Sequence, residues 1–332
     1  MDDDRVGTVI ADRYQLGRVL GRGGMGVVYE GTHKWTRRKL AVKVLKSTVA
    51  RSDIALKRFF QEARAAAGLS HPNVVDVLDL GLDETGEAYI VLELLEGETL
   101  EALLQREGRL SPADTLNYLL PVLDALSLAH EHAIVHRDIK PANIVLSRDA
   151  RGRLVPKLLD FGVAKLLARA DPGTSSPMTG PGAMLGTVHY MAPEFVMYDD
   201  IVTPQCDIWS MGVMLYRCLS GVLPYDAPAN TTVLVMIAST DHKPLHEVVP
   251  ELPKPLCDAV QRALQRELDD RYKTINELVI DLMSAANQSG TPLTAASVMA
   301  ARGSMLPASE RPHGRDLPEF EDTDRDEDTI AD

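Results

Sequence analysis

Apolar residues in the first 95 positions follow the short, glycine-broken pattern of β-strands. The segments rich in β-branched or aromatic residues are 14–19, 26–31, 39–45, 74–80 and 88–94. The sequence DETG at 83–86 suits a hairpin turn between the last two. One helix is predicted over 53–67, where apolar positions recur at helical spacing: Leu56, Phe59, Phe60, Ala63 and Ala67. The pattern therefore predicts a small sheet with one helix.

From about residue 97 the apolar positions recur at helical intervals. Ser111 with Pro112 after it is a typical helix start. Residues 206–219 are apolar nearly all round, as in a buried central helix, and further helices are predicted at 256–265 and 275–286. The composition then shifts to Gly, Pro, Ser and Thr, and finally to acidic residues.

These patterns divide the chain into three parts. We predict a strand-rich lobe over 1–96, with its core from about residue 14, a helical lobe over 97–286, and a disordered acidic tail over 287–332. A short connector near 93–97 joins the lobes. A cleft between two lobes is a common ligand site.

Composition and charge narrow the class of protein. The 332 residues are 45% hydrophobic and 25% charged, as in an ordinary soluble globular protein. The net charge is −13, and residues 316–332 carry nine acidic residues against one basic residue, so most of the charge lies in the tail. This balance argues against a nucleic-acid or anionic-membrane partner bound by bulk charge.

Cysteine usage and the termini point to a cellular compartment. The three cysteines are widely spaced, which fits a reducing compartment and gives no metal motif. The acidic N-terminus does not resemble a signal peptide, and no apolar run approaches a membrane span. We expect a cytoplasmic protein without a membrane span.

A glycine-rich segment, GRGGMG at 21–26, lies between two strand-like segments. Glycines let a backbone approach a polyphosphate and point N–H groups at it. A strand rather than a helix follows Gly26, unlike a dinucleotide-binding site. A plain glycine-rich hairpin remains the alternative.

Lys43 has apolar neighbours in the segment 39–45, which makes it a candidate for a partly buried cation. A surface lysine is the commoner alternative. A buried ammonium needs a partner, because desolvating it alone is costly. Glu62, among alanines on the predicted helix, could supply the carboxylate, unless it is an ordinary solvated residue.

The segment HRDIKPAN at 136–143 is more specific. Asp138 can accept a hydroxyl proton, Lys140 places a cation close by, and Asn143 offers an oxygen ligand suited to magnesium beside a carboxylate. Asp160, in the sequence DFG after a predicted strand at 154–159, is a natural second ligand. A simple turn would also explain Asp160 and Gly162.

The order of these motifs, together with APE at 192–194, resembles the signature set of protein kinases. The resemblance runs over about 14–286 and is greatest to the bacterial serine/threonine kinases that are similar to eukaryotic ones. It implies an α+β, bilobal protein-kinase-like fold, with a small antiparallel-sheet N-lobe carrying one helix and a larger helical C-lobe. It also implies ATP, Mg²⁺ or Mn²⁺, and protein substrates bearing serine or threonine.

The resemblance also implies a role for each site residue. Lys43, held by Glu62, would grip the α and β phosphates, and Asn143 and Asp160 would hold the metal. Asp138 would orient the substrate hydroxyl and accept its proton, and Lys140 would offset charge on the γ-phosphoryl group. The implied nucleotide-binding residues are Leu20, Gly21, Arg22, Gly23, Gly24, Met25, Gly26, Val27, Val28, Ala41, Lys43, Leu92, Glu93, Leu95 and Leu146.

The resemblance also implies the substrate class, because Lys140 and Thr187 favour serine or threonine substrates.

Regulation by autophosphorylation is a hypothesis. The loop 162–186 contains candidate acceptors: Thr174, Ser175, Ser176 and Thr179. A phosphate there could pair with Arg137 and order the loop, which would involve self-association for autophosphorylation in trans. Otherwise these residues only keep the loop polar.

Two structural roles follow from the same resemblance. Asp207 would cap the backbone of the catalytic loop, and Arg271 would pair with Glu194. Val188 and Leu268 stand where the family often has proline, and Asp269-Asp270 is a variant pair.

Two other classes of protein were weighed. A pseudokinase scaffold typically lacks one of the key residues, whereas Lys43, Asp138, Asn143 and Asp160 are all present. A small-molecule kinase is disfavoured by the APE segment, which helps to build a peptide-docking surface. The acidic tail could inhibit the cleft, recruit basic partners, or only solvate the chain.

Overall fold

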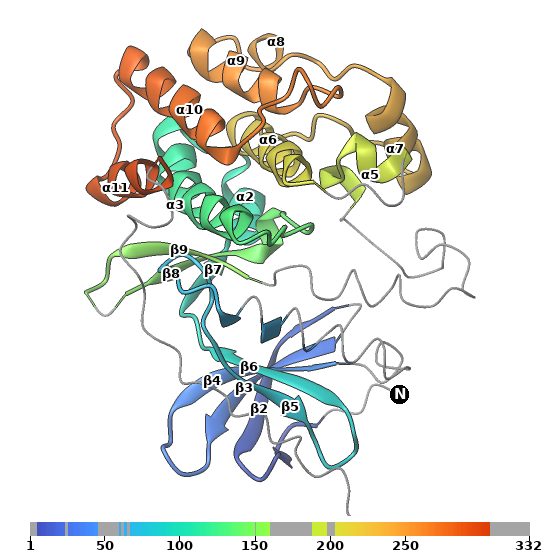
Figure 1. Cartoon of the computed structure of the whole chain (residues 1–332), viewed down its shortest axis with the longest axis vertical. Coiled ribbons are helices and arrows are strands. Elements are labelled where there is room, and N and C mark those ends of the chain that lie inside the picture. The colour runs from blue at the N-terminus through green and yellow to red at the C-terminus, as the bar shows by residue number, and fades with distance from the viewer. Residues whose placement is uncertain are drawn as a thin grey trace, which may run out of the picture.

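The computed structural model describes residues 5–23, 26–45, 60, 63–64, 67–149, 151–159, 188–197 and 203–305. An antiparallel sheet forms one end of the molecule and a group of helices forms the other, with a small second sheet between them (Figure 1). This is the predicted α+β, two-lobed arrangement.

The larger sheet has the strand order β1-β2-β3-β4-β6-β5, and its neighbours pair antiparallel. Its strands are β1 Val9–Ile10, β2 Tyr14–Arg22, β3 Gly26–His33, β4 Lys39–Leu45, β5 Val77–Leu82 and β6 Ala88–Glu93. The prediction for β4 has the observed bounds, and β2 and β3 run beyond theirs. Strand β1 was not predicted, because two residues are too few to show an alternating pattern.

Alternation along β4 gives the sheet two different faces. Leu40, Val42 and Val44 enter one apolar cluster. Leu45 enters another, which includes Ala63 from the predicted helix 53–67. Because successive side chains of a strand point to opposite faces, Lys43 shares the face of Leu45.

Only four positions of the predicted helix 53–67 are described. Phe60, Ala63, Arg64 and Ala67 are helical, as predicted. Glu62 lies outside the described residues.

The second sheet has the order β7-β8-β9 and is antiparallel. Its strands are β7 Gly97–Thr99, β8 Ile144–Arg148 and β9 Leu154–Leu158. In Figure 1 it lies between the larger sheet and the helices. Strand β9 therefore ends at the junction of the two lobes, two residues before Asp160 in the sequence.

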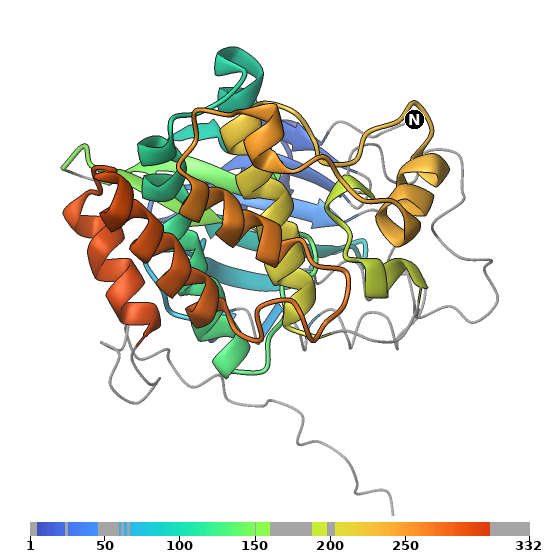
Figure 2. The same ribbon diagram turned by 90° about the horizontal axis from the view of Figure 1, so that it is seen from above.

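Helices make up the rest of the described C-lobe, and Figure 2 shows them in front of the strands. They are α2 Leu100–Glu107, α3 Pro112–Glu131, η1 Pro141–Asn143, η2 Val188–Tyr190, α5 Pro193–Met197, α6 Gln205–Ser220, α7 Asn230–Ser239, α8 Leu245–Val248, α9 Lys254–Ala263, α10 Ile275–Ser289 and α11 Ala295–Ser304. Ser111 caps α3 as predicted, since its hydroxyl accepts the N–H of Asp114 at 3.1 Å. Helix α6 is buried over almost its whole length.

The prediction of a disordered tail from residue 287 was wrong for residues 287–305. Helix α10 continues to Ser289, and α11 packs against α3. Thr294 caps α11 by accepting the N–H of Ser297 at 3.2 Å, and Asn117 of α3 accepts the N–H of Thr294 at 2.8 Å. The small residues of this segment permit close helix packing, although their composition resembles that of a linker. Residues 306–332 lie outside the described residues.

Within the described ranges, none of the helices has the length and apolar character needed to cross a membrane.

Candidate active site

The segment 136–143 is held from behind by Asp207 of α6. The Asp207 carboxylate accepts the backbone N–H groups of His136 at 2.8 Å and Arg137 at 2.9 Å. His130 of α3 makes a 2.8 Å hydrogen bond to the same carboxylate. Arg137 has a left-handed φ of 65°, which is unfavourable for a residue with a side chain. Asp207 thus holds a strained backbone turn in place.

Asp207 is fully buried, and its surroundings keep it ionised. Burial by itself would raise the pKa of this carboxyl group. The hydrogen bond and charge of His130, with the charge and backbone N–H of His136, outweigh burial and lower the pKa of Asp207 below its ordinary value. A charged acceptor forms stronger hydrogen bonds to the N–H groups than a neutral one would.

The structure brings three predicted site residues together in front of this turn. Lys140 Nζ donates to Asp138 Oδ2 at 2.8 Å. Asn143 Nδ2 donates to the same oxygen at 3.0 Å and to the backbone carbonyl of Asp138 at 2.7 Å. The Asp138 carboxylate is therefore oriented by a cation and an amide. Because the amide nitrogen of Asn143 donates to Asp138, its oxygen is the atom suited to a cation.

The strand that leads to Asp160 is anchored beside Asn143. The N–H of Leu159 donates to the backbone carbonyl of Asn143 at 2.8 Å, and the carbonyl of Leu159 is 2.8 Å from Nε2 of His136. Asp160 follows directly but lies outside the described residues. The two predicted metal ligands are thus linked through Leu159, and the shared site remains a prediction.

Two other predictions also fall outside the described residues. They concern Thr187 and the candidate loop acceptors Thr174, Ser175, Ser176 and Thr179. Among the residues that are described, no group of three or more His, Cys, Asp or Glu side chains could hold a metal ion.

On the larger sheet, several predicted nucleotide residues share one face. Val28 pairs with Lys43 across β3 and β4, and Ala41 pairs with Leu92 across β4 and β6. Cross-strand partners lie on the same face of a sheet. Val27 was also predicted here, but its side chain lies on the opposite face in an apolar cluster. Alternation along β3 places Val27 there, so only its backbone can face a nucleotide.

The described glycines of the glycine segment are of two kinds. A Cβ at Gly26 would lie 2.3 Å from the carbonyl oxygen of Val44, so the packing of the strands excludes any side chain there. A Cβ at Gly21 would meet no described atom within 4 Å, and at Gly23 only the carbonyl of Gly26 at 3.9 Å. Contacts within the described protein therefore do not account for glycine at 21 and 23. Their open backbone fits a site for a phosphate group.

The remaining predicted nucleotide residues lie near the glycines, in the connector, in the helical lobe or outside the described ranges. Leu20 and Arg22 are exposed beside the glycines, Leu95 is half-buried in the connector, and Leu146 is buried on β8 in the core of the helical lobe. Gly24 and Met25 are not described.

The connector between the lobes contains a contact that we did not predict. Lys157 of β9 donates to Glu93 Oε1 at 2.5 Å and to the carbonyl of Val74 at 3.1 Å. Glu93 Oε1 also accepts the N–H of Asp76 at 2.9 Å, and the Glu93 N–H donates to the carbonyl of Asp76 at 3.0 Å. These contacts hold Glu93 in place at the start of the connector. The sequence signal that could have identified Lys157 is a single lysine in an otherwise apolar strand, as at Lys43.

Comparison with known proteins identifies the family. Residues 14–282 match the protein kinase domain family. The chain belongs to this family.

Several relatives of the kinase domain are bacterial serine/threonine kinases. The probable serine/threonine-protein kinase PknB of Lactococcus lactis is 33% identical over 284 residues, covering 85% of this chain and 43% of that protein. The serine/threonine-protein kinase PknB of Mycobacterium tuberculosis is 35% identical over 328 residues, covering 96% of this chain and 51% of that protein. The chain therefore spans about half the length of such relatives or less. The predicted resemblance is confirmed.

A solved structure supports the fold of the kinase domain. The crystal structure of a mutant of the PknI kinase domain from Mycobacterium tuberculosis matches with a TM-score of 0.64 at 26% identity. The match covers 85% of this chain and 98% of that one.

A buried ion pair supports the APE segment of the kinase domain, as predicted. Arg271 makes two bonds to Glu194, from Nη1 to Oε1 at 2.8 Å and from Nη2 to Oε2 at 3.1 Å. Its guanidinium also donates to the carbonyls of Gln205, Gln265 and Arg266. All three nitrogens of the buried group thus have partners, as a buried charge requires.

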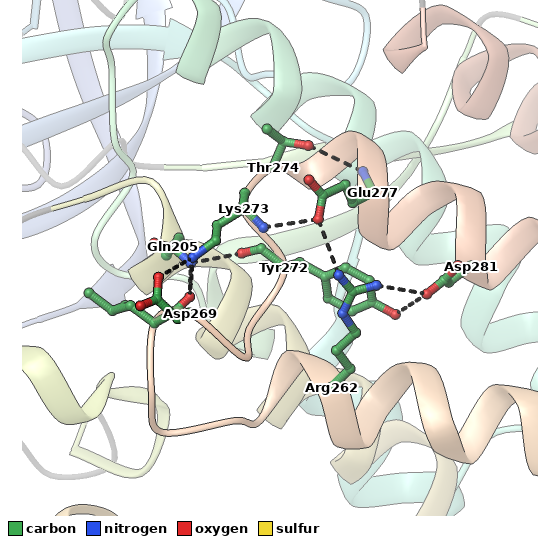
Figure 3. A network of polar contacts seen from close by, with 9 residues as sticks. Gln205, Arg262, Asp269, Tyr272, Lys273, Thr274, Glu277 and Asp281 are labelled. Carbon is green, nitrogen blue, oxygen red and sulfur yellow. Dashed lines mark hydrogen bonds and ion pairs between the residues drawn. The ribbon is translucent and has the colours of Figure 1, made fainter.

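The loop that carries Arg271 keeps its shape without the usual proline at Leu268. Gln205 Nε2 donates to the carbonyls of Leu268 at 2.8 Å and Tyr272 at 2.9 Å, and Lys273 Nζ donates to Asp269 at 2.8 Å (Figure 3). On the other side of this network, Arg262 lies over the Tyr272 ring at 4.2 Å. Side-chain hydrogen bonds therefore replace the constraint that proline would supply.

Proposed function

We propose that the chain transfers the γ-phosphoryl group of ATP to serine or threonine hydroxyls of protein substrates, with Mg²⁺ as the divalent ion or Mn²⁺ in its place. The observation that carries the proposal is the cluster of Asp138, Lys140 and Asn143. Bound ATP would supply the phosphoryl group, and the metal would neutralise charge on its oxygens.

Asp138 is the proposed base. Its carboxylate is oriented by Lys140 and Asn143, so it can hold a substrate hydroxyl in one direction and accept its proton. Lys140 lies 2.8 Å from that carboxylate, so its cation would offset the negative charge that develops on the γ-phosphoryl group. Asn143, with Asp160, would hold the metal through oxygen atoms.

The larger sheet would bind the nucleotide. Val28, Ala41 and Leu92 offer an apolar face for the base, and Lys43 on the same face offers a cation for its phosphates. The open backbone at Gly21 and Gly23 gives phosphate oxygens access to N–H groups. Glu62 would orient Lys43.

Radiolabelled ATP with Mg²⁺ and a generic protein acceptor tests the proposal. The wild type should yield phosphoserine or phosphothreonine, and Asp138→Asn should reduce the rate by about 10²- to 10⁴-fold, because the base is lost. Asp258→Asn, the same change at an exposed site on α9, should leave the rate unchanged. Unlabelled acceptor with the wild type, or full activity in Asp138→Asn, would contradict the proposal.

Autophosphorylation of the loop 162–186 is part of the same proposal. It rests on Arg137, a cation next to Asp138 in the chain, and on the four hydroxyl residues of the loop. Mass spectrometry should find phosphate on the loop of the wild type and none in Asp138→Asn. Mixing Asp138→Asn with active chain would show whether one copy phosphorylates another. An active wild type without loop phosphate would contradict this part.

A further inference from the structure

The turn between β3 and β4, residues 33–39, is a preorganised surface feature of the larger sheet. It lies at the end of β3 opposite the glycine segment. The N–H groups of Trp35 and Thr36 both donate to Nδ1 of His33 at 3.2 Å. The N–H of His33 donates to the carbonyl of Arg38 at 2.9 Å, and the N–H of Lys34 to that of Arg13 at 2.8 Å. The backbone of the turn is thus held by hydrogen bonds within the turn and by one to Arg13.

This fixed turn presents an aromatic side chain to solvent. Trp35 is 78% exposed, the largest fraction among the exposed large apolar residues of the described chain. Because the Trp35 side chain is exposed, it contributes little hydrophobic stabilisation to its own domain. Trp is enriched among the residues that contribute most to binding at interfaces, so Trp35 can serve as an anchor where its surroundings also suit a partner.

The charge around Trp35 is strongly positive. The sequence of the turn is HKWTRRK, in a chain with a net charge of −13. Lys39 and the neighbouring Arg18 both pair with Glu30. Lys34, Arg37 and Arg38 form no ion pair with the residues that the structure describes. Three cations therefore flank the exposed indole, and the partner that fits is an acidic segment with an apolar residue.

We propose that residues 316–332 of the same chain bind this turn. That segment has nine acidic residues against one basic residue, and Phe320 lies between Glu319 and Glu321. Its charge is opposite to that of the turn, and Phe320 supplies an apolar group for Trp35. The fifteen residues from Met305 to Phe320 can span about 50 Å when extended, which gives the segment a long reach from the end of α11. The interaction is independent of the proposed kinase activity.

Fluorescence quenching in the full chain tests this contact. The chain has two tryptophans, and Trp209 is buried, so acrylamide quenching reports on Trp35. In low salt, the quenching constant of the wild type should be about threefold lower than that of a full chain whose tail acids are changed to Asn and Gln. The difference should disappear near 0.5 M NaCl, because salt screens exposed charges. A synthetic peptide of residues 316–332, added to the neutral-tail chain, should restore protection.

Matched variants separate the turn from general charge effects. Lys34→Glu with Arg38→Glu should raise quenching to the neutral-tail level, whereas Arg151→Glu with Lys243→Glu, the same charge change at exposed sites elsewhere, should not. Trp35→Phe should remove the quenchable signal. Protection should persist on dilution, since the contact is within one chain. Equal quenching in the wild type and the neutral-tail chain, or protection lost on dilution, would overturn the proposal.

Discussion

The carboxylate of Asp207 accepts the backbone N–H of Arg137 at 2.9 Å, although 70 residues of sequence separate them. Arg137 has a left-handed backbone, and the next residue is Asp138. The direction of the proposed catalytic carboxylate thus depends on a buried charge on another helix. Strain at a functional site persists only where surrounding contacts hold it.

Replacing Asp207 with asparagine should therefore affect both stability and activity. The uncharged amide forms weaker hydrogen bonds to the N–H groups of His136 and Arg137 and loses the charge that His130 faces. We expect the free energy of unfolding to fall by about 2–3 kcal/mol, and the transfer rate to fall at least about tenfold at a temperature where the variant is folded. Urea unfolding and a kinase assay would measure these. Asp258→Asn is the matched surface control, and an Asp207→Asn variant with wild-type stability would contradict this account.

The two kinds of glycine should respond differently to alanine. Gly26→Ala places a Cβ against the Val44 carbonyl, so it should lower the free energy of unfolding by about 1–3 kcal/mol. Gly21→Ala meets no described atom, so it should change stability by less than about 0.5 kcal/mol. It should nevertheless weaken nucleotide binding several-fold, because the methyl group would occupy the phosphate site. Denaturant unfolding would measure the stability of both variants, and calorimetry with a nucleotide analogue would measure their nucleotide affinity. Unchanged nucleotide affinity in Gly21→Ala would contradict a phosphate site at Gly21.

Lys157 is expected to act as a positioning residue for the nucleotide site. Lys157→Met leaves the Glu93 carboxylate without its cation, so the connector is held less firmly. The KM for ATP should therefore rise by about 5- to 10-fold, with a smaller change in kcat. Lys157→Arg retains a cation, so its KM for ATP should stay close to that of the wild type. Lys254→Met, on exposed α9, serves as the control. A variant in which kcat falls and KM stays constant would show that Lys157 does not act through the connector.

The pH dependence of stability should contain a contribution from His242. Burial lowers the pKa of His242 below its ordinary value, against the opposing hydrogen bond with Gln261. The unfolded chain then binds the proton more readily than the folded chain, so the stability contributed by neutral His242 is lost as the pH falls below about 6.5.

Urea unfolding between pH 5 and 7.5 would measure this contribution. Stability of the wild type should fall more steeply toward low pH than that of His242→Gln, by at most about 1.4 kcal/mol per pH unit. The comparison cancels the other histidines, which both chains share. Parallel pH profiles of the two chains would contradict the assignment.

Local patterns predicted many elements of this protein because they report local geometry. The alternation of β4, the buried character of α6 and the capping of α3 by Ser111 each depend on a few neighbouring residues. The order and spacing of the glycine segment, Lys43, Asp138 and Asn143 predicted the family, since the chemistry of phosphoryl transfer requires those residue types. The composition of 287–305 was misleading, because packing against α3 rather than helical pattern makes α11 ordered.

What the amino-acid order determined by itself was the period of each element, its caps and the set of side chains available for chemistry. Only the tertiary structure decided that Lys157 bonds to Glu93, that Val27 lies away from the nucleotide face, and that α11 packs against α3. These are contacts between residues far apart in the chain, or choices of one face over another. They depend on how complete strands and helices pack, and this packing is a property of the whole fold rather than of any local segment.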